Sequence, residues 1–135
     1  MTQMNPINKY AQTQNATASK ERLMVLLFEA GLRHIRNGAQ ALEAKRFDEA
    51  MTPLTKASDI VMELSRTLDA SRAPDIAPTL KDLYGFINGR LVSAAVANNA
   101  KAAREAERVF APLVEGFQGA VAKLQAEGKL AHDAR

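Results

Sequence analysis

The sequence of 135 residues contains no cysteine and no tryptophan, and only 5% of its residues are aromatic. Because cysteine is absent, a disulfide framework and a thiolate metal site are excluded. No run of about 18 apolar residues could cross a membrane, and residues 1–5 carry neither the basic nor the apolar part of a signal peptide. These absences predict a cytoplasmic protein with no stable membrane insertion.

The sequence also lacks the residue patterns of common enzyme classes. His34 has no glutamate three residues before it, as a di-iron helical bundle requires, and His132 lies in a polar tail. Gly128 and Lys129 are not accompanied by the earlier glycine and the following Ser or Thr of a phosphate-binding loop. No Gly-x-Ser-x-Gly nucleophile motif occurs. We therefore expect a protein that is not an enzyme and that uses no metal and no cofactor.

The charge pattern argues against a nucleic-acid partner. The net charge is +3, but the 18 Lys and Arg residues are interleaved with 15 Asp and Glu residues. Nucleic-acid-binding domains usually gather their cations on one face or in one arm. The one local excess of positive charge surrounds the first predicted helix, and we interpret it as a solvated face.

What the sequence does contain is apolar residues recurring at steps of three and four, the pattern of amphipathic helices. Four such segments span residues 19–45, 48–69, 76–98 and 100–127, and their short connections favour antiparallel neighbours. The sequence thus predicts an all-α fold, an antiparallel up-down-up-down four-helix bundle over residues 19–127. A mobile N-terminal leader, residues 1–18, precedes the bundle, and a polar tail, residues 128–135, follows it. The expected core positions are Met24, Leu27, Phe28, Gly31, Ile35, Gly38, Leu42, Ala50, Leu54, Ala57, Val61, Leu64, Leu68, Ile76, Leu80, Leu83, Ile87, Leu91, Ala94, Ala106, Phe110, Leu113, Phe117, Val121 and Leu124.

The first two helix starts depend on capping residues. Ser19 is the predicted N-cap of the first helix, because its hydroxyl can accept a free backbone N–H of the first turn. For the second helix two alternatives stay open. Either Asp48 is the cap and Pro53 bends the second turn, or Thr52 is the cap and Pro53 is the first helical residue.

Later boundaries are marked by asparagine and glycine. Asn98 is suited to a left-handed helix end, and Asn99 can cap the next helix. Pro112 is expected to bend the fourth helix, and Gly128 to stop it.

Some apolar residues lie outside the predicted core and are candidates for a surface that binds a partner. Gly85, Gly89, Val92 and Val96 follow one another at steps of four, three and four, on one face of the third helix. Such a face could accept another helix closely, and tight packing inside the bundle is an equal alternative. In the second helix, Met51, Ile60 and Met62 fall off the core positions, which fits either an adaptable surface or a broad core face.

The order and spacing of several short runs resemble the FliS family of flagellar secretion chaperones. These runs are NPINKY (5–10), TAS (17–19), LMVLLFEAGL (23–32), KASDIVMEL (56–64), TLD (67–69), LY (83–84) and ANN (97–99). The likeness extends over residues 5 to 120. Departures include Lys20 and Arg22, where the family usually has Pro and Glu after the capping serine, and Phe117 in place of a late aromatic that is often Trp.

This resemblance implies an export chaperone that works without ATP. Its client would be the disordered C-terminal segment of flagellin, which it would keep from polymerising too early and deliver to the flagellar export gate. In the family the leader packs near the client site, so Ile7 and Tyr10 would act as a lid over it. The alternative from the residues alone is a generic helical dimerisation or sensor module, and a homodimer stays open.

Overall fold

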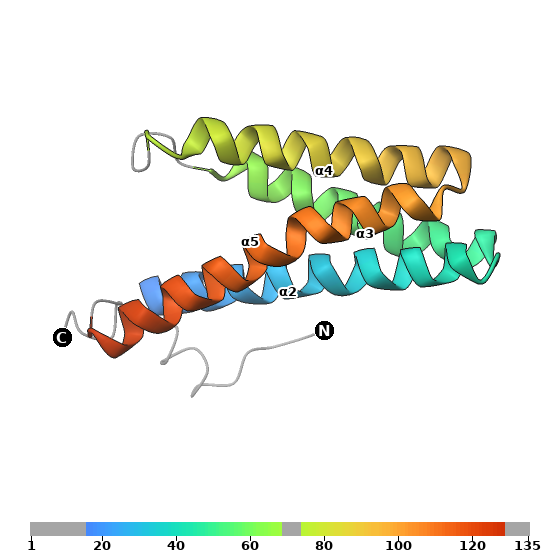
Figure 1. The fold of residues 1–135 in the computed structure, drawn as a ribbon. Helices are drawn as coiled ribbons and strands as arrows, with labels where there is room; N and C mark the ends of the chain where they lie inside the picture. Colours follow the sequence, from blue (N-terminus) through green and yellow to red (C-terminus); the bar gives the residue numbers. More distant parts are fainter. Residues whose placement is uncertain (1–15, 69–73, 129–135) are drawn as a thin grey trace, which may run out of the picture.

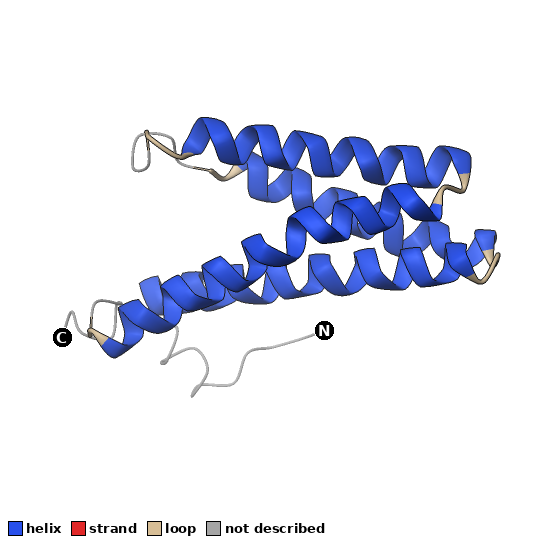
Figure 2. Ribbon diagram, in the orientation of Figure 1, coloured by secondary structure: helices blue, strands red, loops and turns tan. Residues whose placement is uncertain are grey.

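The computed structural model of the chain describes residues 16–68 and 74–128 and consists there of four α-helices (Figure 1). They are α2 (Ala16–Glu43), α3 (Phe47–Arg66), α4 (Ala77–Ala97) and α5 (Ala100–Ala126). Within these ranges the structure contains no strand (Figure 2). Each helix packs against its two neighbours in the order α2, α3, α4, α5 and back to α2. The predicted all-α, antiparallel four-helix bundle is confirmed.

The four helices are not parallel along their whole length. Where α2 passes into α3 and α4 into α5, all four lie close together, whereas at the opposite end the α3–α4 pair diverges from the α2–α5 pair (Figure 1). The closed end is packed with small side chains that are fully buried: Ala39, Ala50, Ala94, Ala102, Ala103 and Ala106. The buried side chains toward the open end are larger and include Phe28, Leu64 and Tyr84. This gradient of side-chain volume explains the splay, because interhelical distance follows the size of the residues at the contact.

Charged side chains also join α2 to α5 near the closed end. Arg104 forms a two-pronged pair with Glu43, with Nε to Oε2 at 2.8 Å and Nη2 to Oε1 at 2.7 Å. Its third guanidinium nitrogen reaches Glu107 Oε1 at 2.8 Å, and Arg36 Nε donates to the other oxygen of Glu107 at 2.8 Å. The result is a chain of four alternating charges across the helix pair.

The turns at the closed end confirm two of the predicted boundaries. Asn98 has φ 50° and ends α4 in the left-handed conformation, and the Asn99 side chain accepts a hydrogen bond from Ala102 N at 3.1 Å. Between α2 and α3 the left-handed residue is Lys45, with φ 63°. Arg46 N donates to Ala41 O at 2.8 Å, which closes a Schellman motif. At the other end of α5, Gly128 has φ 70° and stops the helix as predicted.

The predicted capping of the first two helices is wrong. α2 already begins at Ala16, so Ser19 lies inside the helix, as the high helix propensity of the alanines around it favours. α3 begins at Phe47 and continues through Pro53, with Arg46 at the N-cap position and Asp48 in the first turn. Neither Asp48 nor Thr52 is therefore the cap. Ala50 and Leu54 are buried on either side of Pro53, and this packing holds the helix together where one backbone hydrogen bond is missing.

Two predicted core positions, Ile76 and Leu124, are also wrong. On α4 the fully packed position is Tyr84, with Leu83 half-buried beside it, and Ile76 is 56% exposed just before the helix starts. On α5, Leu124 is 37% exposed in the last turns, where the helix pairs have diverged. The other predicted positions are buried or half-buried.

Candidate functional site

An apolar cleft of about 400 Å³ lies at the open end, lined by all four helices. Its walls include Met24 and Phe28 of α2, Leu64 of α3, Tyr84 of α4, and Leu113 and Phe117 of α5. Because the gradient of side-chain size separates the helix pairs here, large apolar groups face one another without closing the space between them. We call this site the cleft.

Stacked aromatic rings fix the α2–α5 side of the cleft. The Phe28 ring stacks on Phe117 with centroids 4.8 Å apart, and on Phe110 with centroids 5.8 Å apart. Phe110 is fully buried, so the stack is anchored in the core. Phe28 is the middle ring, so it cannot turn without losing contacts on both sides.

Tyr84 brings a polar group into the apolar cleft. The residue is 5% exposed, and its hydroxyl forms no hydrogen bond with any other residue that the structure describes. Burial raises the pKa of this phenol. Sequence reasoning did not single out Tyr84 as a site residue, although a tyrosine at a core position usually needs a partner for its hydroxyl.

The second surface is the side of α4 that faces away from the core, which we call the α4 outer face. It carries Gly85, Gly89, Val92 and Val96, and the two valines are 49% and 81% exposed. A Cβ atom added at Gly85 or Gly89 would meet nothing within 4 Å. Tight packing of these residues inside the bundle, the alternative that the sequence left open, is therefore wrong.

Charge is scarce on α4. Its 21 residues include three charged ones, Lys81, Asp82 and Arg90, whereas the 20 residues of α3 include six. A helix that is apolar on its outer side as well as its inner side usually has something packed on both. The α4 outer face is thus a surface suited to contact with an apolar partner.

Of the other residues predicted to bind a client, some pack against the core and one is exposed. Met51 and Ile60 are half-buried and pack against the core, whereas Met62 is 56% exposed. The hydroxyl of Ser58 donates to Asn88 Oδ1 and sets the register between α3 and α4. In this antiparallel register Met62 lies at the level of Tyr84 and Gly85. Ile7 and Tyr10 of the leader lie outside the described residues.

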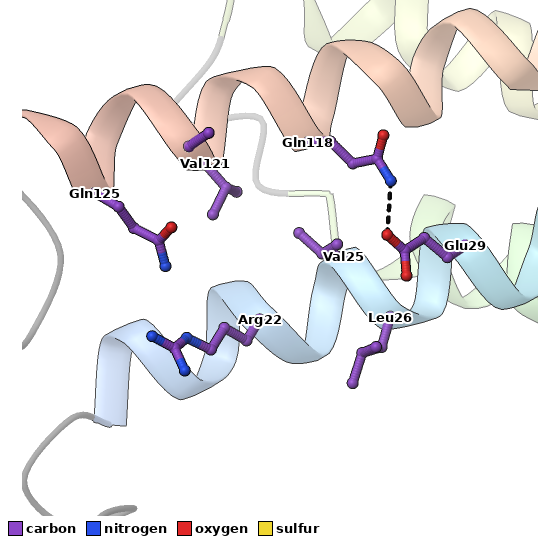
Figure 3. A pocket seen from close by; sticks show the side chains of 8 residues that line it. Arg22, Val25, Leu26, Glu29, Gln118, Val121 and Gln125 are labelled. Atoms are coloured by element: carbon purple, nitrogen blue, oxygen red, sulfur yellow. Dashed lines mark hydrogen bonds between the residues drawn. The ribbon is translucent and has the colours of Figure 1, made fainter.

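A third surface, the α2–α5 groove, was not predicted. It has a volume of about 400 Å³ and is lined by Val25, Leu26 and Val121, with Arg22 and Gln125 nearer the end of the helices (Figure 3). Gln118 Nε2 donates to Glu29 Oε2 at 2.6 Å and bridges the two helices at one end of the groove (Figure 3). Leu26 is 59% exposed, so this groove adds to the apolar surface of the splayed end.

The titratable groups in the described part of the chain form no metal site. No three of its His, Asp or Glu side chains are grouped so that they could hold a metal ion. Burial and the nearby charges of Arg33 and Lys56 lower the pKa of His34. None of the described helices is long and apolar enough to cross a membrane.

Comparison of the sequence with known proteins assigns the chain to a family. The family described as "Flagellar protein FliS" matches residues 3–124. The chain is 29% identical over 132 residues to "Flagellar secretion chaperone FliS" of Bacillus subtilis, and the match covers 98% of this chain and 96% of that protein. It is 28% identical over 123 residues to "Flagellar secretion chaperone FliSB" of Pseudomonas aeruginosa, covering 88% of this chain and 98% of the relative. Since the family match and both relatives run across nearly the whole bundle, the chain belongs to the FliS family of flagellar secretion chaperones.

Proposed function

We propose that this chain is a cytoplasmic export chaperone that binds the C-terminal segment of flagellin on the α4 outer face. By covering that segment it would prevent premature polymerisation and deliver the subunit to the flagellar export gate. Binding requires neither nucleotide nor metal and involves no catalytic step. The observation that carries the proposal is the exposed, nearly uncharged α4 outer face with its two unobstructed glycines.

The shape of the face supports an α-helical ligand. Small residues at a helix surface let a second helix approach closely, and flanking valines then fill the grooves on either side. Helix-in-groove recognition of this kind uses apolar anchors one helical turn apart, which is the spacing of Gly85, Gly89, Val92 and Val96. A segment that folds on binding loses conformational entropy, which limits its affinity and so permits release at the export gate.

The leader enters the proposal as a competitor. Ile7 and Tyr10 are apolar residues in a segment otherwise too polar to form a core of its own. We propose that they cover the client surface in the free protein and leave it when the client binds. A second copy of the chain could use the same face, which would make the protein a homodimer.

The test separates binding from folding with glycine substitutions. In the free protein, Gly89→Ala should raise stability by up to ~1 kcal/mol, because alanine favours the helix and meets no neighbour. The same methyl group would hold a client helix away from α4, so affinity for a flagellin C-terminal peptide should fall about tenfold or more. Gly119→Ala on α5 is the matched control, since it is also an exposed helical glycine without neighbours. It should raise stability alike and leave affinity unchanged.

Calorimetry without nucleotide or divalent metal gives the affinity, and sedimentation gives the oligomeric state. Val96→Asp should also weaken binding while the melting midpoint stays constant, because Val96 is 81% exposed. If the intact protein binds no cognate flagellin tail at micromolar concentration, the proposal fails. Should Gly89→Ala instead abolish a dimer and leave client binding intact, the face serves self-association.

A further inference from the structure

We propose that the Tyr84 hydroxyl is the polar anchor of the cleft, where it donates a hydrogen bond to a main-chain carbonyl of a second, apolar stretch of the client. This inference rests on the proposed function. It adds a second binding site, on the opposite side of α4 from the outer face, and names the residue that selects what enters it.

The state of Tyr84 in the structure motivates the proposal. More than nine in ten buried polar groups in proteins have a hydrogen-bond partner, and leaving one without a partner costs about 1–3 kcal/mol. Tyr84 is 5% exposed and lines the cleft, yet no other described residue bonds to its hydroxyl. A ligand that fills the cleft expels water from this hydroxyl. A ligand that brings an acceptor avoids the cost, whereas a purely apolar ligand incurs it.

The other cleft residues restrict the chemistry of that acceptor. The hydroxyl of Thr67 already donates within α3 to the carbonyls of Glu63 and Leu64, at 3.0 and 3.3 Å. The lining contains no Lys, Arg, Asp or Glu. A carboxylate would lose its hydration there without meeting a cation, which is unfavourable. A neutral carbonyl oxygen is therefore the matching acceptor.

The carbonyl must also be free to accept. Inside a continuous α-helix each carbonyl is engaged by the N–H four residues later, and only the last four of a helix are free. The occupant of the cleft is thus the end of a client helix, or an extended stretch, with apolar side chains against Phe28, Leu80 and Phe117. A continuous helix suits the α4 outer face instead.

The two sites are close enough to be used by one client chain. Tyr84 faces the cleft, while Gly85, the next residue along α4, faces solvent. A segment bound on the outer face therefore holds its continuation near the cleft at a high effective concentration. Contacts in the cleft then raise the affinity of the whole segment, although each site alone binds weakly.

The decisive experiment is Tyr84→Phe in the full-length protein, with a cognate flagellin C-terminal peptide as the probe. The substitution deletes the hydroxyl and keeps the ring, so the unfolding midpoint of the free protein should stay the same or rise. Affinity for the peptide should fall about tenfold, with the loss in the dissociation rate. Thr67→Val is the matched control, because it deletes a cleft hydroxyl that is already bonded within the chain. Its affinity should be unchanged.

A spectroscopic measurement tests the hydrogen bond itself. The chain has two tyrosines and no tryptophan, so in a Tyr10→Phe background the near-ultraviolet spectrum reports on Tyr84. Adding a peptide without tyrosine or tryptophan should move the phenol absorbance to longer wavelength, as donation of a hydrogen bond does. Deleting residues 1–15, which also removes Tyr10, should leave this response in place.

The outcomes separate this inference from the proposed function. If the intact protein binds the peptide and Tyr84→Phe binds it equally well, the anchor is wrong and the chaperone function stands. If the intact protein binds no flagellin tail, both are wrong. A lower unfolding midpoint for Tyr84→Phe would show that the hydroxyl serves the bundle. A Tyr84 spectrum that changes on deletion of the leader but not on addition of peptide would assign the cleft to the chain's own leader, and would also overturn the inference.

Discussion

Gly38 of α2 lies directly against Leu54 of α3, so closely that a Cβ atom at residue 38 would be 2.6 Å from Leu54 Cδ2. Leu54 is 1% exposed and is itself enclosed by the core at the closed end, where the helices approach most closely. The glycine is thus required by the short distance between α2 and α3, whereas the glycines of the α4 outer face have no such role within the bundle.

Replacing Gly38 by alanine should therefore destabilise the protein. Overpacking a filled core typically costs about 1–3 kcal/mol, which exceeds the gain of up to ~1 kcal/mol from the better helix propensity of alanine. Urea denaturation of Gly38→Ala should show a lower midpoint than the parent protein, and Gly119→Ala a higher one. Equal midpoints for the two variants would mean that α2 and α3 move apart freely at this contact.

A second prediction compares two leucines that the sequence assigned to the core. Leu64 is 2% exposed, whereas Leu83 is only half-buried. Leu64→Ala should cost about 2–5 kcal/mol, and Leu83→Ala clearly less, because its cavity is open to solvent on one side. Thermal denaturation of both variants measures the difference. If Leu83→Ala proved as costly as Leu64→Ala, the orientation of α4 described above would be contradicted.

These two leucines also show where sequence reasoning ends. The recurrence of apolar residues predicted the ends of the four helices to within three residues at each described boundary. The residue types at Asn98, Asn99 and Gly128 predicted the boundaries at these positions. Leu83 and Tyr84 are neighbours on α4, and a periodic pattern does not tell which of them faces the core. That choice depends on the rotation of α4 against α3 and α5, which the packed side chains determine together.

The functional surfaces, too, could be predicted from the sequence only in part. The spacing of Gly85, Gly89, Val92 and Val96 showed that they share a face, but only the fold shows that the face is exposed. The cleft could not be predicted, since it arises where large side chains of four helices meet and hold the helix pairs apart. Whether the Tyr84 hydroxyl has a partner among the described residues likewise depends on how the folded side chains are arranged, which the pattern of residues does not show.

The charges that join α2 to α5 predict how stability depends on pH. The hydrogen bond from Arg104 lowers the pKa of Glu43 below its ordinary value of 4.5. Partial burial raises the pKa of Glu107, but hydrogen bonds from Arg36 and Arg104 outweigh this effect, and the net pKa is lowered too. A carboxyl group with a lowered pKa in the folded state stabilises the fold above its unfolded-state pKa. This contribution is lost as the pH falls below about 5 and through the folded-state pKa.

Arg104→Gln should weaken this acid dependence. Urea midpoints measured from neutral to acidic pH should fall less steeply below about pH 5 in the variant than in the parent. Arg66→Gln removes an exposed pair with Glu63 inside α3 alone and should leave the slope unchanged. The lowered pKa of His34 adds a separate loss of stability as the pH falls past 6.5, and both variants should retain it. If the urea midpoint of Arg104→Gln fell below about pH 5 as steeply as that of the parent, a stabilising role for these pairs would be contradicted.

The last prediction concerns the leader. If Ile7 and Tyr10 cover the client surface in the free protein, the apparent affinity for client is reduced by the fraction of molecules in which the surface is covered. Deleting residues 1–15 leaves α2 intact, because this helix begins at Ala16. The truncated protein should then associate faster with a flagellin tail, since no molecule has to uncover its binding surface first.

The same deletion can also speed dissociation, which lowers the affinity instead of raising it. If Tyr10 keeps a contact with the client in the complex, its loss should also speed dissociation, and Tyr10→Ala should reproduce this part alone. Stopped-flow mixing of the intact, truncated and Tyr10→Ala proteins with the same peptide gives both rate constants for each. The intact and truncated proteins should differ at least in the association rate, because a covered surface acts on that step. Identical association and dissociation rates would leave the leader without a part in client binding.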